Sequence, residues 1–519
     1  MSKINQVSKK DWILIGLVLL VCALAFLPQV TSLGYYHDDW FPTISHVSGV
    51  DLVEMHWGDR PMMGRWYALV DRVLGEAPLA WHLFAFFARF AGALGLYVLS
   101  RVLWPEQRTA GAVIALIYAI YPGFLQQTSA NNYQNHIAAY AAAIFSLLFS
   151  VLAVKAGKIW QKGALTVAAA GLAYFYPRIY EAMIGMEGFR FFLIWVMVRR
   201  KTSGKFLPTL REALLYFLPF LLVAGQFIYW RFIVFSGNRV STDSEMIIDQ
   251  LRSHPISAAG RIILNVLTDF FEMTLGGWII PAYKLASTAQ LRHLALSFGL
   301  SVGAVAAVFL PVRWLKSKQE PQRSPTPEKA RWTVEAIWLG VLGVLITLTP
   351  VALTGRDVQY RIYLDRYTYQ SIAPAAFLLT GLIFGLVKTS WRIYAVSLLA
   401  FLAVFTHNLN ASAYALNWEY QKLVWWQLTW RAPGIAPGTT LVVQMPQTYR
   451  YPEDFEIWAP ASRIYYPGPG PLQLTAEVLN TETVEVMLKR EQVSRNYRGV
   501  TFVRDFNQAL ITSMPTEDS

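Results

Sequence analysis

The sequence is short of cysteine and of charge. Only one of its 519 residues is a cysteine, Cys22, and only 15% of the residues are charged. A single thiol inside an apolar run excludes a disulfide framework, and no Cys/His spacing typical of a zinc site is present. A soluble protein of this length would carry far more charge, so the composition also excludes a large soluble enzyme.

Apolar residues are correspondingly abundant. Hydrophobic residues make up 55% of the chain, and apolar runs of roughly 20 residues, long enough to cross a bilayer, recur along most of it. We therefore predict an all-α polytopic membrane bundle of about eleven transmembrane helices. The predicted spans are Trp12–Val30, Ala80–Leu103, Ala110–Gln126, Ile137–Val154, Ala164–Tyr176, Met183–Val198, Leu214–Val234, Leu294–Trp314, Val334–Leu353, Ile372–Val387 and Tyr394–His407.

The net charge of +12 arises from basic clusters between these runs rather than from a nucleic-acid-binding surface. Such clusters mark cytoplasmic loops, and we expect no nucleic-acid partner. The stretch that follows Lys9 and Lys10 is too long for a signal peptide and has no small-x-small cleavage site, so we interpret it as a retained first span. This predicts a multi-pass protein of the inner or plasma membrane, with a cytoplasmic N-terminus and an exported C-terminal domain. The predicted cytoplasmic clusters are Arg101/Arg108, Lys155/Lys158/Lys162, Arg199/Arg200/Lys201/Lys205, Arg313/Lys316/Lys318 and Lys388/Arg392.

The transmembrane domain is predicted to cover residues 1–410. Within it, Ile262–Ile280 carries Asp269, Glu272 and a Gly-Gly pair, and counting it as a span would place Lys316 outside. We interpret segment 237–290 as an exported re-entrant or interfacial element, with a simple span as the alternative. The Pro/Ser-rich stretch Lys318–Lys329 is predicted to be a cytoplasmic linker.

The composition changes after the last predicted span. Residues 411–432 carry four tryptophans, which predicts a helix at the membrane interface. Residues 433–519 predict a small exported α/β domain, with strands at Thr440–Met445, Leu472–Leu479, Val484–Leu488 and Val500–Val503. Such a domain either recognises an acceptor or caps the bundle. We favour the cap, since nothing in it resembles a catalytic constellation.

An aspartate pair follows the first span, in the sequence Tyr35-Tyr36-His37-Asp38-Asp39-Trp40. Adjacent carboxylates at a lipid interface repel each other and lose hydration, so they are seldom placed there without a partner. The plain alternative is an ordinary polar loop. The rest of loop 34–78 predicts short amphipathic helices that carry several arginines.

With this loop, the chain resembles the GT-C superfamily of membrane glycosyltransferases, which includes the protein O-mannosyltransferases and the bacterial lipid A aminoarabinose transferase. The resemblance covers the whole chain as architecture, and only the acidic pair as a motif. It implies a polyprenyl-phosphate-linked sugar donor, which reaches the site from the lipid, and a glycan, lipid or protein acceptor. A carboxylate would serve as general base, with slight preference for Asp39 over Asp38, while the other would orient the acceptor or a metal. His37 could tune the base or, with both aspartates, coordinate a divalent cation such as Mg²⁺ or Mn²⁺.

A donor phosphate requires cations, and arginines are concentrated on the predicted exported side, where positive charge is normally sparse. Each could equally be an interfacial or ion-paired residue. Glu181 lies near Arg178 and is a further candidate, whereas Glu187 and Arg190 lie three apart and could neutralise each other. Indole rings of the acidic loop are candidates for stacking on sugar. The substrate-binding candidates, besides His37 and Glu181, are Arg60, Arg65, Arg178, Arg356, Arg361, Arg366, Trp40, Trp57 and Trp66.

Two other function classes remain open. A lipid or solute transporter or flippase of the cell envelope would carry ionisable residues at mid-membrane on several helices. A non-enzymatic assembly protein would tolerate loss of Asp38 and Asp39. The gathering of ionisable residues at one membrane face favours the glycosyltransferase.

Overall fold

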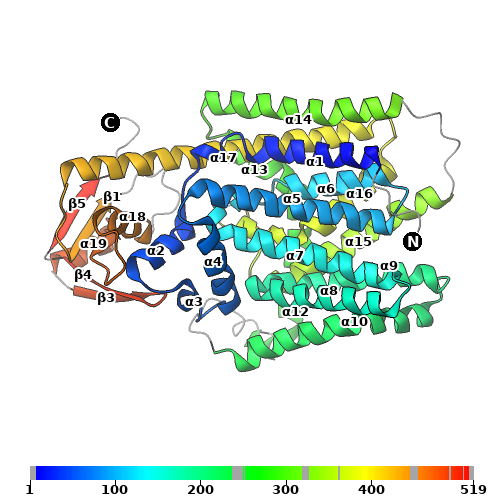
Figure 1. Cartoon of the computed structure of the whole chain (residues 1–519), viewed down its shortest axis with the longest axis horizontal. Coiled ribbons are helices and arrows are strands. Elements are labelled where there is room, and N and C mark those ends of the chain that lie inside the picture. The colour runs from blue at the N-terminus through cyan, green and yellow to red at the C-terminus, as the bar shows by residue number, and fades with distance from the viewer. Residues whose placement is uncertain are drawn as a thin grey trace.

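The computed structural model describes residues 8–236, 249–250, 252–317, 327–360, 363–444, 454–489, 492–506 and 508–513. A bundle of long helices carries a small α/β domain at one end (Figure 1). We call this end the domain end and the opposite one the basic end. The longer helices of the bundle are α1 (Lys9–Phe26), α5 (Pro78–Leu103), α6 (Arg108–Ile120), α7 (Ala130–Lys155), α8 (Ile159–Ile179), α9 (Gly185–Lys201), α10 (Phe206–Tyr229), α12 (Pro255–Phe271), α13 (Gly277–Ala286), α14 (Leu291–Ser317), α15 (Pro327–Ala352), α16 (Ile372–Leu386) and α17 (Arg392–Arg431).

The polytopic bundle predicted from the sequence is confirmed, although the number of spans differs. Within the described ranges, nine helical stretches are long and apolar enough to cross a membrane. Eight of them coincide with predicted spans, and the ninth is Pro255–Ala286. The three other predicted spans form helices α6, α8 and α9. These helices are too short or not apolar enough to be counted among the nine.

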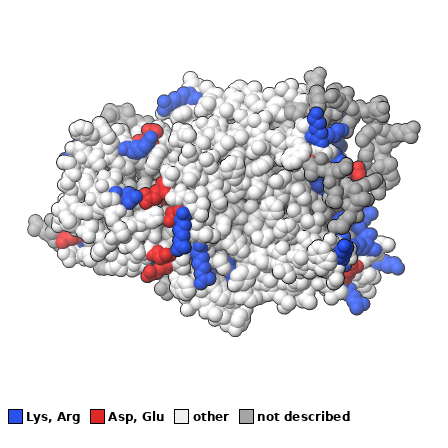
Figure 2. Space-filling model, viewed as in Figure 1, with Lys and Arg blue, Asp and Glu red and all other residues white. Residues whose placement is uncertain are grey.

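The basic clusters gather at one end of the bundle. Arg101 at the end of α5 and Arg108 at the start of α6 each lie 3.5 Å from a carboxylate oxygen of Asp11, in the first turn of α1. Lysine and arginine are concentrated at this end in Figure 2, and the surface between it and the domain end is almost free of charge in this view. Such a belt suits contact with lipid tails. Lys318 lies outside the described residues, as does most of the predicted linker.

Helices α12 and α13 continue into each other through a π-helical turn at Glu272–Gly276. Their contacts stay at the domain end. Asp269 accepts a hydrogen bond from the backbone N–H of Val358 at 2.9 Å, and Lys284, fifteen residues later, donates to the Tyr360 carbonyl at 3.1 Å. Both ends of this stretch are thus bonded to the loop that follows α15. Its interfacial placement stays a prediction.

The last bundle helix differs from the prediction. Instead of a span followed by a separate interfacial helix at 411–432, α17 is one helix of 40 residues. No glycine or proline interrupts it between Arg392 and Arg431, so nothing in the backbone ends the helix at the membrane surface. Figure 1 shows α17 leaving the bundle and reaching the C-terminal domain.

The C-terminal α/β domain is confirmed, with one strand assigned wrongly. Its parallel sheet has the order β2–β1–β5, and β3 and β4 form an antiparallel hairpin. Predicted strand Val484–Leu488 is part of a helix, because Val484, Met487 and Leu488 follow the helical period of three to four residues. The elements are β1 (Thr439–Gln444), α18 (Phe455–Tyr465), β2 (Leu474–Val478), α19 (Thr481–Leu488), β3 (Gln492–Tyr497), β4 (Val500–Asp505) and β5 (Ala509–Ser513).

Loop 34–78 forms short helices, as predicted, and packs between the bundle and the C-terminal domain. We call it the jaw loop. Its elements are the 3₁₀ helix η2 (His37–Trp40) and helices α2 (Phe41–Ser48), α3 (Leu52–Met55) and α4 (Pro61–Leu74).

A buried ion pair holds α9 within the bundle, as the spacing predicted. Arg190 Nε lies 2.7 Å from Glu187 Oε2, and the Arg190 side chain is fully buried. The guanidinium also donates to Ser146 of α7 at 2.7 and 2.9 Å. The pair thus joins two helices.

Replacing Arg190 with leucine should lower the free energy of unfolding by about 3–5 kcal/mol, because it leaves the Glu187 carboxylate buried without its partner. The double variant Glu187→Leu/Arg190→Leu should recover much of that loss. Thermal unfolding in detergent measures both. Equal stability of the single and double variants would contradict this role of the pair.

Candidate active site

The two aspartates of η2 have different environments. The Asp39 side chain is fully buried, and its Oδ1 accepts the backbone N–H of Asn132, in the first turn of α7, at 2.7 Å. Its Oδ2 accepts the N–H of Tyr36 at 3.1 Å. Asp39 therefore joins the jaw loop to the N-terminus of α7, where the helix dipole favours a negative charge.

Asp38 is the accessible member of the pair. Its side chain is 27% exposed, and its Oδ1 lies 3.1 Å from His37 Nδ1. Burial raises the pKa of Asp38, but the charge and hydrogen bond of His37, together with the charges of Arg498 and Arg366, outweigh burial and hold that pKa below its ordinary value. Asp38 is thus an ionised carboxylate that faces cations.

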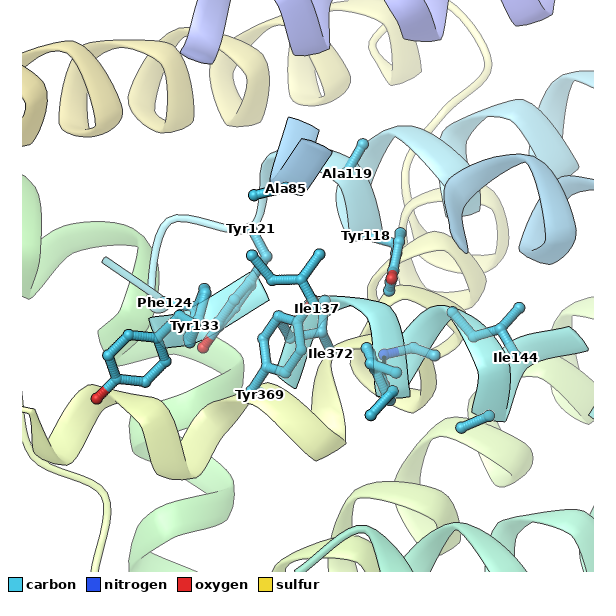
Figure 3. Close-up of a cluster of buried hydrophobic side chains, with 14 of the residues drawn as sticks. Ala85, Tyr118, Ala119, Tyr121, Phe124, Tyr133, Ile137, Ile144, Tyr369 and Ile372 are labelled. Carbon is cyan, nitrogen blue, oxygen red and sulfur yellow. Dashed lines mark hydrogen bonds between the residues drawn. The ribbon is translucent and has the colours of Figure 1, made fainter. Parts of the chain in front are cut away.

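Arg366 owes its position to a buried framework. It belongs to the 3₁₀ helix η7 (Leu364–Ser371), in which Asp365 accepts the Leu125 N–H at 2.7 Å and the Gln126 side-chain amide at 2.6 Å. The ring of Tyr369, also in η7, packs on Phe124, with centroids 4.2 Å apart (Figure 3). These contacts fix η7 against the connection between α6 and α7.

Arg366 lies beside aromatic rings at the site. Its guanidinium donates to the Tyr367 hydroxyl at 3.1 Å and lies 5.1 Å from the centre of that ring. Arg356 approaches the same ring at 5.7 Å. Both predicted arginines are therefore brought to one place.

A second cationic group forms around Glu181. Arg60 Nε lies 2.9 Å from Glu181 Oε2, and Arg231 Nε lies 3.7 Å from Oε1. Arg60 also lies within electrostatic range of Arg366. Two arginines around one carboxylate leave a net positive charge. Through Arg366, this group is connected to the cations beside Asp38.

A cavity lies between the jaw loop and helices α8 and α10, and Pro61 and Trp230, the sequence neighbours of Arg60 and Arg231, are in its lining. It encloses about 320 Å³, and Arg65 and Arg178 line it together with Trp57, Trp230 and Phe235. Arg178 Nη1 donates to the Tyr174 carbonyl at 2.8 Å, and its guanidinium stacks 3.6 Å from the Tyr174 ring centre. Cations and aromatic rings in one cavity suit an anion attached to an apolar chain.

Residues 59–224 match the family described as dolichyl-phosphate-mannose-protein mannosyltransferase. This match confirms the predicted GT-C resemblance. The predicted enzyme class, a membrane glycosyltransferase, is confirmed at the level of that family.

Other comparisons are more distant. No curated protein matches. The crystal structure of ArnT from Cupriavidus metallidurans bound to undecaprenyl phosphate has 12% sequence identity and a TM-score of 0.36, over 97% of this chain and 99% of that one. The apo structure of the same protein has the same identity and TM-score, over 91% and 97%.

Two predicted stacking residues are used in packing instead. Trp40 is buried, with its ring 5.3 Å from that of Tyr35. Trp66 donates its indole N–H to Gln134 at 3.1 Å and packs on Phe175. Of the three tryptophans, Trp57 alone lines the cavity, while Arg361 lies outside the described residues.

Several residues at the site were missed by the sequence analysis. Tyr133 and His136 of α7 lie with their rings 5.1 Å apart, and His136 packs on Tyr180 at 4.6 Å. Electrostatic interactions connect His136 to Arg60 and Asp38. The polar run Asn131–His136 was the available signal, because such residues are unusual at the start of a membrane helix. The predicted span began after them, at Ile137.

The aspartate pair does not form a convincing metal site. Both Asp39 oxygens accept backbone N–H groups, and Asp38 is paired with His37. Within the described parts of the chain, no group of three or more His, Cys, Asp or Glu side chains is arranged to hold a metal ion.

The environment of Asp39 predicts a pH effect on stability. Burial raises the pKa of Asp39 from 3.8 to about 7, although the N–H groups of Asn132 and Tyr36 lower it. A folded-state pKa above the unfolded one means that the folded protein holds the proton more tightly between pH 4 and pH 7. The contribution of Asp39 to the free energy of unfolding should therefore fall as the pH rises through this window.

Thermal unfolding of the wild type and of Asp39→Asn across pH 4–8 measures this contribution. The stability difference between the two proteins should change across the window, since the amide does not titrate. A difference that stays constant with pH would contradict the assigned environment.

Proposed function

We propose that this chain transfers a sugar from a polyprenyl-phosphate donor to an acceptor hydroxyl on the non-cytoplasmic face, with inversion at the anomeric carbon. Asp38 acts as the general base. The observation that carries the proposal is a partly exposed, ionised carboxylate beside a surface of arginines. The matched family is described by a dolichyl-phosphate sugar, which supports this donor class.

Asp38 suits the base better than Asp39, which the sequence slightly favoured. A base must come within hydrogen-bond reach of the acceptor hydroxyl. Asp39 is fully buried and already accepts two N–H groups, whereas Asp38 is 27% exposed. The role of Asp39 is to hold the turn that presents Asp38.

The reaction requires one proton transfer and one displacement. Asp38 takes the proton of the acceptor hydroxyl while that oxygen forms a bond to the anomeric carbon. The bond from this carbon to the phosphate oxygen breaks, and polyprenyl phosphate leaves with the electron pair. A phosphate needs little protonation to leave, so one carboxylate suffices for an inverting transfer.

The arginines receive the charge of the leaving phosphate. Arg366 lies within electrostatic range of both Asp38 and Arg60, and so connects the base to the cationic group at Glu181. Arg65 and Arg178 extend positive charge into the cavity, whose aromatic walls suit the first isoprene units. Fixed cations placed where negative charge develops stabilise a transition state.

A transporter is the second candidate, and the described ionisable residues do not favour it. Most gather at the domain end and at the basic end. Two buried groups lie between the ends: the neutralised pair Glu187–Arg190, and Arg89 of α5, whose guanidinium donates to the Ala119 carbonyl and to Gln127. A route across the membrane would need polar groups at intermediate depth on several helices.

Asp38→Asn tests the proposed base. In a deletion strain of the source organism, the wild type should restore the glycolipid or polysaccharide profile. Asp38→Asn should not restore it, because loss of a general base costs about 10²–10⁴-fold in rate. Asp51→Asn is the matched control, since Asp51 is an exposed residue of the same loop that caps α3. Full restoration by Asp38→Asn at normal expression would favour a transporter or scaffold.

Cysteine labelling tests the orientation. Gly157 at the basic end and Gly468 in the C-terminal domain are both exposed, and neither has atoms within 4 Å of an added Cβ. In a Cys22→Ser background, a membrane-impermeant maleimide should label Gly468→Cys in intact cells and Gly157→Cys only after lysis. The reverse pattern would place the candidate base in the cytoplasm and overturn the proposed function.

A further inference from the structure

The C-terminal domain contacts η2, at the candidate active site, through α18. Glu456 of α18 is 2% exposed, and its Oε1 accepts the backbone N–H of His37 at 2.5 Å. The neighbouring Phe455 places its ring edge-on to the His37 imidazole, with centroids 5.4 Å apart. Both contacts fall on the residue directly before Asp38.

The backbone at His37 requires such support. Its φ is +49°, in the left-handed region that non-glycine residues rarely adopt. Such conformations persist only where the surroundings hold them, and they gather at functional sites. Tyr363, whose ring lies 4.6 Å from the His37 ring, also has a left-handed φ, of +61°.

A second contact of the same domain supports the jaw loop. Arg498, in the turn between β3 and β4, lies 3.3 Å from an Asp59 carboxylate oxygen. Its guanidinium also covers the ring of Phe41 at 4.7 Å. Phe41 directly follows η2, so the domain holds the catalytic turn on both sides.

From these contacts we propose that the C-terminal domain completes the active site, and that Glu456 is a positioning residue. Its carboxylate accepts the His37 N–H, fixes the left-handed turn and thereby keeps the Asp38 carboxylate paired with His37 and directed at the acceptor. The domain is then more than the cap that the sequence favoured. This inference rests on the proposed function, because it assigns Glu456 a role in presenting the base.

Glu456→Ala removes the acceptor, whereas Glu456→Gln keeps an oxygen in the same place. Glu477→Ala is the matched control, because it breaks an ion pair with Arg504 inside the domain. All three are made in the full-length protein in lipid nanodiscs. Hydrogen exchange of residues 37–41 is measured in each, together with kcat and KM for a polyprenyl-phosphate sugar and the pH profile of kcat/KM.

We expect Glu456→Ala to speed exchange in the 37–41 segment and to lower kcat about 10²-fold, as for a misplaced catalytic group, while donor KM stays near the wild-type value. The acid limb of the pH profile should move to higher pH, since a loosened turn separates Asp38 from His37. Glu456→Gln should keep most of the activity. Glu477→Ala should leave exchange at 37–41 and the pH profile as in the wild type.

Equal effects of Glu456→Ala and Glu477→Ala would show a general loss of domain stability and overturn the positioning role. Unchanged exchange at residues 37–41 in Glu456→Ala would overturn it as well. If the wild type transfers no sugar, the proposed function fails, and the exchange data still decide whether Glu456 holds the turn.

Discussion

The structure of the site depends on the hydrogen bond between the Asp39 carboxylate and the first turn of α7. It fastens the loop that follows the first helix to the N-terminus of a helix from the middle of the bundle. Asp38 then projects from a turn whose other residues are held. Without this contact, two adjacent aspartates on a polar loop would repel each other and hydrate separately.

The charged residues near this hydrogen bond have two kinds of role. Asp365 fixes η7, and with it Arg366, by accepting a backbone N–H and a side-chain amide. Glu181 pairs with Arg60 and Arg231. The buried pair Glu187–Arg190 takes no part in the site and joins α9 to α7. Charged residues in the membrane domain therefore either surround the candidate site or join helices.

The sequence was sufficient for those features that depend on local patterns. Runs of apolar residues located the helices, basic clusters located one end of the bundle, and the position of Asp38-Asp39 pointed to the candidate site, which stays a prediction. It could not distinguish Asp38 from Asp39, because the two differ only in contacts with Asn132 and His37 formed after folding. The partners of Glu181 were equally hidden, since Arg60 lies 121 residues away and Arg178, its neighbour in sequence, stacks on Tyr174 instead. The length of α17 was underestimated because polarity changes at residue 411 while helix propensity does not.

The unbroken α17 has a mechanical consequence. A helix of 40 residues is about 60 Å long and resists bending, so one rigid helix connects the bundle to the C-terminal domain. A rotation of the whole domain relative to the bundle would have to break or tilt α17. Opening the candidate site would therefore require local movement of the jaw helices, which breaks contacts such as Arg498–Asp59, rather than movement of the whole domain.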